Sequence, residues 1–225
     1  MAIRWVEMLP FLMAVVVLGA LLLGALRLTK VSWSKAATFS GIITVILIGY
    51  LLVFFRDPVR TPSPNPADIV AGAEGKVMSV VTVDEPEFLK CKALRISIFL
   101  SLVDVHVNRS PIEGTVVSAT NCPGARYFTF QEKSSEFNQH SSIVIRGAQT
   151  TCLVKQIVGP VARRVVYWIK PGDVLQKGDR IGMMKFGSRL DMYFPADEVE
   201  AVVKRGDKVR AGETVVARLK NTQGV

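Results

Sequence analysis

Two long segments without charged residues open the chain. The first extends over nineteen residues from Met8 to Leu26, and the second over twenty residues from Ala36 to Phe55. An α-helix rises about 1.5 Å per residue, so either segment would cross the roughly 30 Å of a bilayer core. The pattern predicts a helical hairpin in the membrane, or two helices lying deep in one leaflet. A cleaved signal peptide fits less well, because no small-residue cleavage site precedes Arg27 and a second apolar segment follows.

The charges around these segments do not orient them in a membrane. The polar connection between them and the two outer flanks carry three basic side chains each: Arg27, Lys30 and Lys35 against Arg4, Arg56 and Arg60. The positive-inside rule therefore gives no preference.

The pattern changes after residue 56. Asp57–Pro66 contains four prolines in ten residues, which predicts an extended linker. Short runs rich in valine and isoleucine then alternate with glycine-containing turns, as is typical of a β-rich domain. Beyond residue 60, only Phe194–Val203 hints at helical periodicity, with a helical turn expected over residues 197–200. The runs are KVMSVVTV, LRISIFL, GTVVSAT, SSIVIRG, CLVKQIVG and RRVVYWI.

The predicted fold is therefore mainly β, a sandwich or barrel-sandwich-like domain preceded by two hydrophobic N-terminal membrane helices. We expect residues 1–55 to form the membrane-anchoring hairpin, residues 56–66 the proline-rich linker and residues 67–225 the β domain.

A short internal sequence repeat lies near the C-terminus. Residues 169–178 (IKPGDVLQKG) recur as residues 203–212 (VKRGDKVRAG), each with a Gly-Asp pair suited to a tight turn between strands. Two such units resemble lipoyl and biotinyl carrier domains, and Met184-Lys185 lies near where a carrier presents its modified lysine. A membrane-tethered carrier domain modified at Lys185 is therefore one functional alternative.

Composition supports a globular membrane protein and excludes a disordered one. Of the 225 residues 49% are hydrophobic, and the formal net charge is +9. The basic balance suits an anionic membrane surface, and given the apolar N-terminus we expect no nucleic-acid partner. Cys91, Cys122 and Cys152 are widely spaced, which predicts packing residues rather than a disulfide framework or a metal site.

The dipeptide Gly187-Ser188 allows a distinctive chemistry. Without a Cβ, glycine would let the Ser188 hydroxyl reach the preceding carbonyl carbon in a strained turn. The resulting ester could undergo β-elimination at Ser188, and hydrolysis would then leave an N-terminal pyruvoyl group. Gly-Ser alone is a weak signal, because the dipeptide is common in turns.

Further motifs strengthen that signal, and together they resemble the short-form phosphatidylserine decarboxylases. The resemblance covers residues 54 to about 200 and agrees in both order and spacing. The motifs are Phe54–Pro58 (FFRDP), Arg95–Ser101 (RISIFLS), Asp104–Pro111 (DVHVNRSP), Gln156–Gly159 (QIVG), Ala162–Arg164 (ARR) and Phe186–Arg189 (FGSR).

The resemblance implies a self-cleaving, pyruvoyl-dependent enzyme that converts phosphatidylserine to phosphatidylethanolamine and CO₂. Cleavage between Gly187 and Ser188 would give a β chain of residues 1–187 and an α chain of residues 188–225, which form a heterodimer. The pyruvoyl group made from Ser188 would form a Schiff base with the substrate amine and act as an electron sink. No pyridoxal phosphate and no metal are expected. His106 matches the family's motif histidine and is the candidate acid or base.

Two positions depart from the family pattern. Glu74 stands where members usually carry the aspartate that orients the maturation base, and its side chain reaches one methylene further. Arg109 stands where longer members carry a second histidine, so His106 or another base must serve. The remaining histidine, His140, lies in a polar stretch and is expected at the surface.

Arginines are the candidate ligands of the substrate's phosphodiester or carboxylate, because guanidinium makes planar bidentate contacts to such groups. The resemblance also places the domain on the cytoplasmic side of the cell membrane, against its phospholipid substrate. A higher oligomer is left open by the sequence. The arginines are Arg95, Arg109, Arg163, Arg164 and Arg189.

Overall fold

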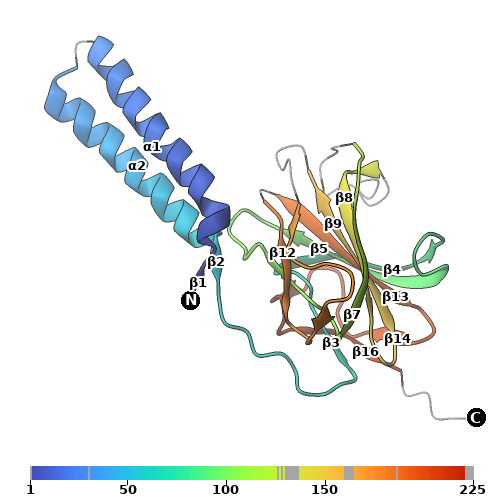
Figure 1. The fold of residues 1–225 in the computed structure, drawn as a ribbon. Coiled ribbons are helices and arrows are strands. Elements are labelled where there is room, and N and C mark those ends of the chain that lie inside the picture. Colours follow the sequence, from blue (N-terminus) through green and yellow to red (C-terminus); the bar gives the residue numbers. More distant parts are fainter. Residues whose placement is uncertain are drawn as a thin grey trace, which may run out of the picture. The chain divides into compact units, whose positions relative to one another are not determined.

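The computed structural model describes residues 2–29, 31–125, 127, 129, 137–159, 165–185 and 187–220. The chain divides into two compact units, residues 1–59 and residues 60–225 (Figure 1). The division falls within the segment that the sequence predicts as a linker.

The N-terminal unit is a helical hairpin. Helix α1 (Trp5–Leu28) and helix α2 (Trp33–Phe54) lie side by side, and a two-residue pairing of β1 (Ala2–Ile3) with β2 (Arg56–Asp57) closes the open end. The helices approach closely at Gly19, whose carbonyl oxygen accepts a 2.6 Å hydrogen bond from Ser40 Oγ. A Cβ at Gly19 would overlap Thr44 Oγ1, so a larger residue there would displace the Thr44 hydroxyl group.

Both helices are long and apolar enough to cross a membrane, and little of either is covered by protein. Only 6% of the most apolar window of α1 and 17% of that of α2 are buried. A core helix of a soluble protein would be mostly buried, so their composition suits lipid contact.

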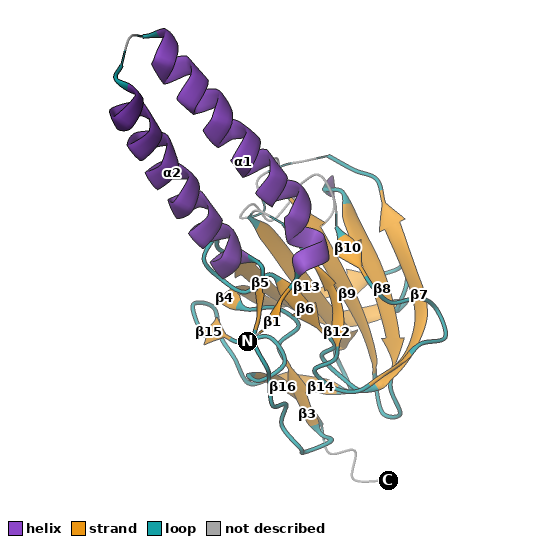
Figure 2. Cartoon of the chain, turned by 60° about the vertical axis from the view of Figure 1, so that its left-hand side comes forward, coloured by secondary structure: helices purple, strands orange, loops and turns teal. Residues whose placement is uncertain are grey.

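The C-terminal unit is built on one curled eight-stranded antiparallel sheet (Figure 2). Two three-stranded sheets, β10-β12-β6 and β14-β16-β3, accompany it. In spatial order the large sheet comprises β11 (Val174–Leu175), β7 (Gly114–Cys122), β8 (His140–Arg146), β9 (Thr151–Val158), β13 (Ser188–Pro195), β5 (Cys91–Leu100), β4 (Gly75–Glu85) and β15 (Lys208–Val209). The small sheets comprise β10 (Val166–Tyr167), β12 (Arg180–Met183), β6 (Val107–Arg109), β14 (Val199–Ala201), β16 (Val215–Leu219) and β3 (Asp68–Val70).

The main core lies on one face of the large sheet. Side chains alternate between faces along a strand, so Leu190, Met192 and Phe194 of β13 share the core face. Ile69, Ile181 and Val216 of the small sheets pack into the same cluster. The mainly β fold expected from the sequence is therefore confirmed, and Cys152 is a packing residue of this core.

The repeated Gly-Asp units form matching turns. Gly172 and Gly206 have φ of +94° and +102°, conformations that favour glycine. In each unit the aspartate carboxylate accepts a 2.9 Å bond from the backbone N–H three residues earlier, and a short strand follows. That strand pairs with Gly114 and Thr115 of β7 in the first unit and with Gly75 and Lys76 of β4 in the second, and a glutamate precedes the glycine in both. The structural duplication thus includes the partner strands β7 and β4 and extends beyond the short repeat seen in the sequence.

Two local expectations are wrong. Residues 197–200 do not form a helical turn: residues 196–198 form a turn and Val199–Ala201 is β14, in which Val199 is buried and pairs with Leu219. His140 is not at the surface: only 9% of it is exposed, at the start of β8. It pairs there with Ile157 and Cys122 on either side, so neighbouring strands cover it.

Candidate active site

Ser188 begins the central strand β13 and is fully buried. It lies between Leu100 of β5 and Val158 of β9, which pair with it on either side. By strand alternation its side chain shares the core face with Leu190. Among the described residues its Oγ has no hydrogen-bond partner. A buried hydroxyl in this state costs free energy, which is a reason to look for a chemical role.

The peptide before Ser188 is held in a tight, unusual conformation. Gly187 has φ of +67°, in the left-handed region that glycine tolerates best. Thr129 Oγ1 donates a 3.5 Å hydrogen bond to the Gly187 carbonyl oxygen. A Cβ on Gly159 would lie only 3.1 Å from that oxygen, so the backbones approach closely. The carbonyl that Ser188 Oγ would attack therefore faces a hydroxyl donor, as an oxyanion-stabilising site requires. Thr129 belongs to none of the motifs recognised in the sequence.

His106 lies at the same end of the sheet as Ser188. Its ring is fully buried, and Nδ1 donates a 2.8 Å hydrogen bond to the Asp104 carbonyl oxygen. In the neutral ring this donation leaves the lone pair on Nε2, the form that can accept a proton. The His106 carbonyl oxygen accepts from Met184 N at 3.2 Å, which ties this residue to the segment leading into Gly187-Ser188.

Glu74 contacts the backbone beside His106. Its Oε1 accepts a 3.4 Å hydrogen bond from Val105 N, and its Oε2 forms an ion pair with Arg60. The duplicated position in the other half of the domain is Glu113, which is exposed. The two related glutamates thus have different surroundings, and only Glu74 contacts the segment that carries His106.

A chain of buried polar side chains lies beneath these residues. Ser141 Oγ donates to Gln156 Oε1, and Gln156 Nε2 donates to Asn108 Oδ1, both at 2.7 Å. All three side chains are fully buried. Gln156 lies on β9, the strand next to β13, and pairs there with Leu190 of β13. Asn108 Nδ2 has no partner among the described residues, so an amide donor remains for a bound molecule.

The arginines predicted to bind substrate are mostly buried. Arg189 is fully buried, and its guanidinium donates to Asp191 Oδ1 at 2.7 Å and Ser97 Oγ at 2.8 Å. Alternation along the strand places its side chain on the face opposite that of Ser188. Arg95 pairs with Tyr193, and by the same alternation its side chain also lies on this opposite face.

Arg109 is also buried, and its Nη1 donates to the Gly178 carbonyl oxygen at 2.9 Å. Arg163 and Arg164 lie outside the described residues. A substrate-binding role for the arginines stays a prediction.

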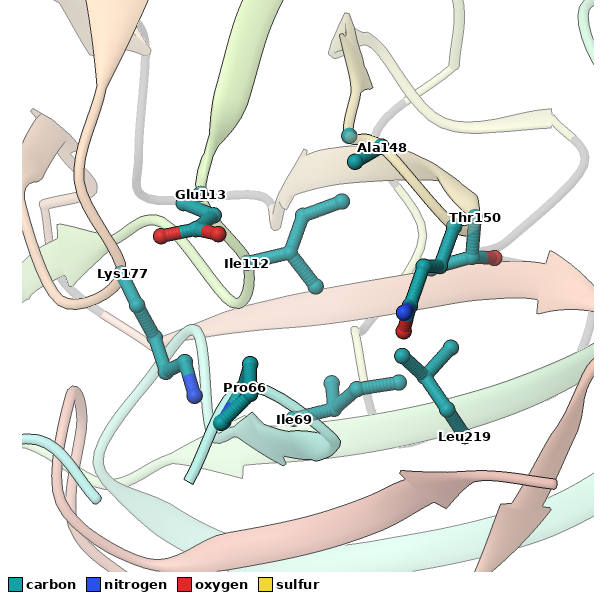
Figure 3. Close-up of a pocket in the computed structure, with 10 residues that line it drawn as sticks. Pro66, Ile69, Ile112, Glu113, Ala148, Thr150, Lys177 and Leu219 are labelled. Atoms are coloured by element: carbon teal, nitrogen blue, oxygen red, sulfur yellow. The ribbon is translucent and has the colours of Figure 1, made fainter. Parts of the chain in front are cut away.

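A separate cavity of about 90 Å³ lies at the other end of the sheet (Figure 3). Ile69, Ile112 and Leu219 line it, together with the turn between β8 and β9. Burial lowers the pKa of Lys177 there, and its Nζ donates to the carbonyl oxygens of Ser63 and Asn65. The strand register places this cavity away from Ser188, so it is not part of the candidate site.

The residues around Ser188 fit a pyruvoyl group formed in place. The group would begin β13 at a buried position, and Asn108, whose Nδ2 has no partner among the described residues, is linked to this strand through Gln156, the partner of Leu190. Among the described residues, no three His, Cys, Asp or Glu side chains lie close enough together to bind a metal ion.

The fold and this site define a β protein with a membrane-compatible anchor and a buried Gly-Ser site suited to self-processing. The family model for phosphatidylserine decarboxylase matches residues 48–217. A phosphatidylserine decarboxylase proenzyme of Carboxydothermus hydrogenoformans is 42% identical over 180 residues, covering 80% of this chain and 84% of that protein. The proenzyme of Chlorobium phaeovibrioides is 39% identical over 216 residues, covering 96% and 98% of the two chains.

The chain belongs to the phosphatidylserine decarboxylase family. Nothing in these comparisons supports the carrier alternative. Lys185 is half-buried at the end of β12, whereas a carrier lysine must be presented to a modifying enzyme.

Proposed function

We propose that this protein is a self-cleaving decarboxylase that converts phosphatidylserine to phosphatidylethanolamine and CO₂ at the cytoplasmic face of the cell membrane. Its family membership supports the reaction class, and its two apolar helices suit a substrate that remains in a bilayer. The observation that carries the proposal is the buried Ser188 hydroxyl next to a Gly187 carbonyl to which Thr129 donates.

Maturation begins at the Gly187–Ser188 peptide. Ser188 Oγ attacks the Gly187 carbonyl carbon, the C–N bond breaks, and an ester replaces the amide. Thr129 Oγ1 stabilises the negative charge that develops on the carbonyl oxygen. His106 Nε2 accepts the hydroxyl proton and passes it to the Ser188 nitrogen as the C–N bond breaks, and Glu74 positions the segment that carries His106 through the Val105 N–H.

Elimination then completes the processing. Loss of the Ser188 Cα proton breaks the Cβ–O bond, releases the Gly187 carboxylate and leaves dehydroalanine. Water hydrolyses the imine tautomer of that residue, ammonia departs, and the pyruvoyl group remains at the N-terminus of the α chain. The α chain, residues 188–225, begins with β13, which pairs with β5 and β9 of the β chain, residues 1–187. This central pairing would hold the two chains together as a heterodimer after cleavage.

The pyruvoyl group supplies an electron sink for the electron pair released when CO₂ leaves. The protein's own residues bind the headgroup, protonate the carbon that has lost CO₂ and exclude water. His106 Nε2 takes up a proton from solvent and donates it to the carbon that has lost CO₂, and Asn108 Nδ2 donates to a polar atom of the bound headgroup. The buried side chains Leu100 and Leu190 limit water access beside Ser188.

The test is production of phosphatidylethanolamine and CO₂ by the purified full chain. Ser188→Ala removes the attacking oxygen, so both cleavage and turnover should disappear. Ser188→Cys and Ser188→Thr keep a nucleophile and should cleave slowly. Borohydride added with substrate, or hydroxylamine alone, should inactivate the wild type, and the adduct should lie on the small chain. Turnover by an uncleaved Ser188→Ala chain would refute the proposal.

A further inference from the structure

A short turn beside His106 presents two apolar side chains to solvent. Leu102 is 50% exposed and Val103 is 66% exposed, in the connection between β5 and β6. The turn is well fixed, because Asp104 Oδ2 accepts hydrogen bonds from Ser101 N at 2.8 Å and Ser101 Oγ at 2.6 Å. Its strand β5 ends at Leu100, which pairs with Ser188, so the turn lies at the Ser188 end of the sheet.

Two aromatic side chains are exposed at the same end. Tyr127 is 42% exposed and Phe137 is 57% exposed, and they are the exposed large aromatic residues among those described in the C-terminal unit. Asn138 fixes their position. Its Oδ1 accepts from Tyr127 N at 2.9 Å, and its Nδ2 donates to the carbonyl oxygen of Val158, the β9 residue that pairs with Ser188.

A basic edge lies next to this apolar surface. Lys76 of β4 and Lys208 of β15 are direct partners across the two strands, and both are exposed. Like charges directly opposite one another destabilise a strand pair, and a bound anion would reduce this repulsion. Lys76 also pairs with Phe99, one residue from Leu100, and shares a surface hollow with Arg205. The basic edge, Lys76, Arg205 and Lys208, therefore belongs to the Ser188 end.

We propose that the Ser188 end is the surface by which the C-terminal unit docks on an anionic phospholipid bilayer. Leu102, Val103, Tyr127 and Phe137 enter the boundary between headgroups and acyl chains, and the basic edge contacts lipid phosphates and carboxylates. Exposed apolar groups rimmed by cations are the two features that bind a protein to such an interface. The inference rests on the proposed function, since it explains how a headgroup reaches Ser188 while its acyl chains stay in the bilayer.

The direct test measures lipid contact at one labelled position. A full chain with Cys91→Ser and Cys122→Ser keeps only the fully buried Cys152, and Val103→Cys then accepts an environment-sensitive fluorophore. Val174→Cys is the matched control, because Val174 is 72% exposed on β11 at the opposite end of the sheet. The probe is a vesicle of phosphatidylglycerol and phosphatidylcholine that carries brominated acyl chains as quenchers.

The label at position 103 should shift to the blue and be quenched by the brominated lipid, whereas the label at position 174 should not. Equal quenching at the two positions, or none at position 103, would overturn the docking surface. Disulfide cross-linking between two copies of the unlabelled Val103→Cys chain, with no quenching of the labelled chain, would assign the surface to a second copy instead. This readout needs no turnover, so it can fail or succeed independently of the decarboxylase activity.

A kinetic comparison adds a functional readout. For Leu102→Asp/Val103→Asp, the ratio of turnover on long-chain vesicle substrate to turnover on a short-chain, water-soluble phosphatidylserine should fall about tenfold. Lys76→Glu/Lys208→Glu should lower the same ratio, and most strongly at low salt, where screening is weakest. Val174→Asp should leave it unchanged. An unchanged ratio in both double variants would contradict the proposal, whereas a wild type inactive on both substrates would count against the proposed function.

Discussion

The hydroxyl group of Thr129 donates a hydrogen bond to the Gly187 carbonyl oxygen, in the peptide group that precedes Ser188. We predict that Thr129→Val slows self-cleavage about a hundredfold, the effect of removing one oxyanion donor. The 3.5 Å bond should shorten as charge develops on the oxygen, so a long bond in the resting chain is compatible with this effect. Gel analysis of the time course of the two chains measures it.

Thr129→Ser is the control, because serine keeps the donor and removes only a methyl group. It should cleave at close to the wild-type rate. If Thr129→Val and the wild type cleave equally fast, Thr129 is a packing residue and another group stabilises the carbonyl oxygen.

Residues differ in how much of their role a sequence reveals. Recognisable motifs contain Gly187-Ser188, Glu74 and His106, and their chemistry can be predicted from the residue types. The structure then places Glu74 in contact with the backbone next to His106. Thr129 stands in no motif, since its role depends on a contact across 58 residues of chain. Its partner, a backbone carbonyl, leaves no pattern in the sequence.

Strand β13 shows why an element can escape prediction from its sequence. A strand buried on both faces normally consists almost entirely of apolar residues, but β13, which is buried on both faces, carries Arg189 and Asp191 in its interior. Both are fully buried, and their 2.7 Å ion pair lets each charge compensate the other. Five of the six apolar runs, in contrast, become the long strands β4, β5, β7, β8 and β9. The short strands β6 and β12 depend on tertiary pairing and leave little signal in the sequence.

The ion pair in β13 has a testable energetic consequence. Arg189→Met removes the 2.7 Å ion pair of the buried Asp191 carboxylate and should lower the free energy of unfolding by about 3–5 kcal/mol. Arg189→Met/Asp191→Leu removes both charges and should recover most of that loss. Denaturant unfolding of the full chain in detergent measures both variants. A double variant that recovers its stability and keeps the wild-type KM assigns Arg189 a structural role, whereas a raised KM would support the predicted substrate contact.

Strand β8 gives a pH dependence through His140. Burial lowers the pKa of His140, although its bond to the Asn138 carbonyl oxygen acts in the opposite direction. The unfolded chain, with a His pKa of about 6.5, therefore binds a proton more readily than the folded chain. The contribution of neutral His140 to the free energy of unfolding should be fully present above the unfolded pKa. It should decline as the pH falls through that value toward the lower pKa of the folded chain.

The variant His140→Gln isolates this effect, because the chain has only one other histidine, His106. The denaturant midpoint of the wild type should fall between pH 7 and pH 5 more steeply than that of His140→Gln. Parallel pH profiles for the two proteins would show that His140 does not control stability in this range. The polar residues around His140 predict a surface position. They are compatible with a buried strand because Ser141 Oγ and Gln156 Oε1 form a hydrogen bond inside the sheet, which the sequence does not show.

At the scale of the whole molecule, the two compact units suggest a division of labour between anchoring and chemistry. We predict that deleting residues 1–53 leaves self-cleavage intact, because the groups proposed for it lie in residues 60–225. Turnover on vesicles should weaken, and weaken further as salt rises, since the remaining attachment to the membrane then depends in part on charge attraction, which is screened within about 10 Å at 0.1 M. Vesicle turnover at increasing ionic strength measures this.

Two results would change this picture of the anchor. Unchanged vesicle turnover by the shortened chain at high salt would show that the helices do not position the enzyme. A shortened chain unable to cleave itself would show that the helices are part of the catalytic fold.

The central claim is that Ser188 becomes the catalytic group, and the intact masses of the purified wild-type chains test it most directly. Cleavage at 187/188 should give a small chain of about 4 kDa, in proportion to 24.7 kDa for 225 residues. That chain should be lighter than the encoded residues 188–225 by one ammonia, and its N-terminus should resist sequential degradation. A single uncleaved chain that still forms phosphatidylethanolamine, or a small chain that begins with unmodified Ser188, would contradict the account.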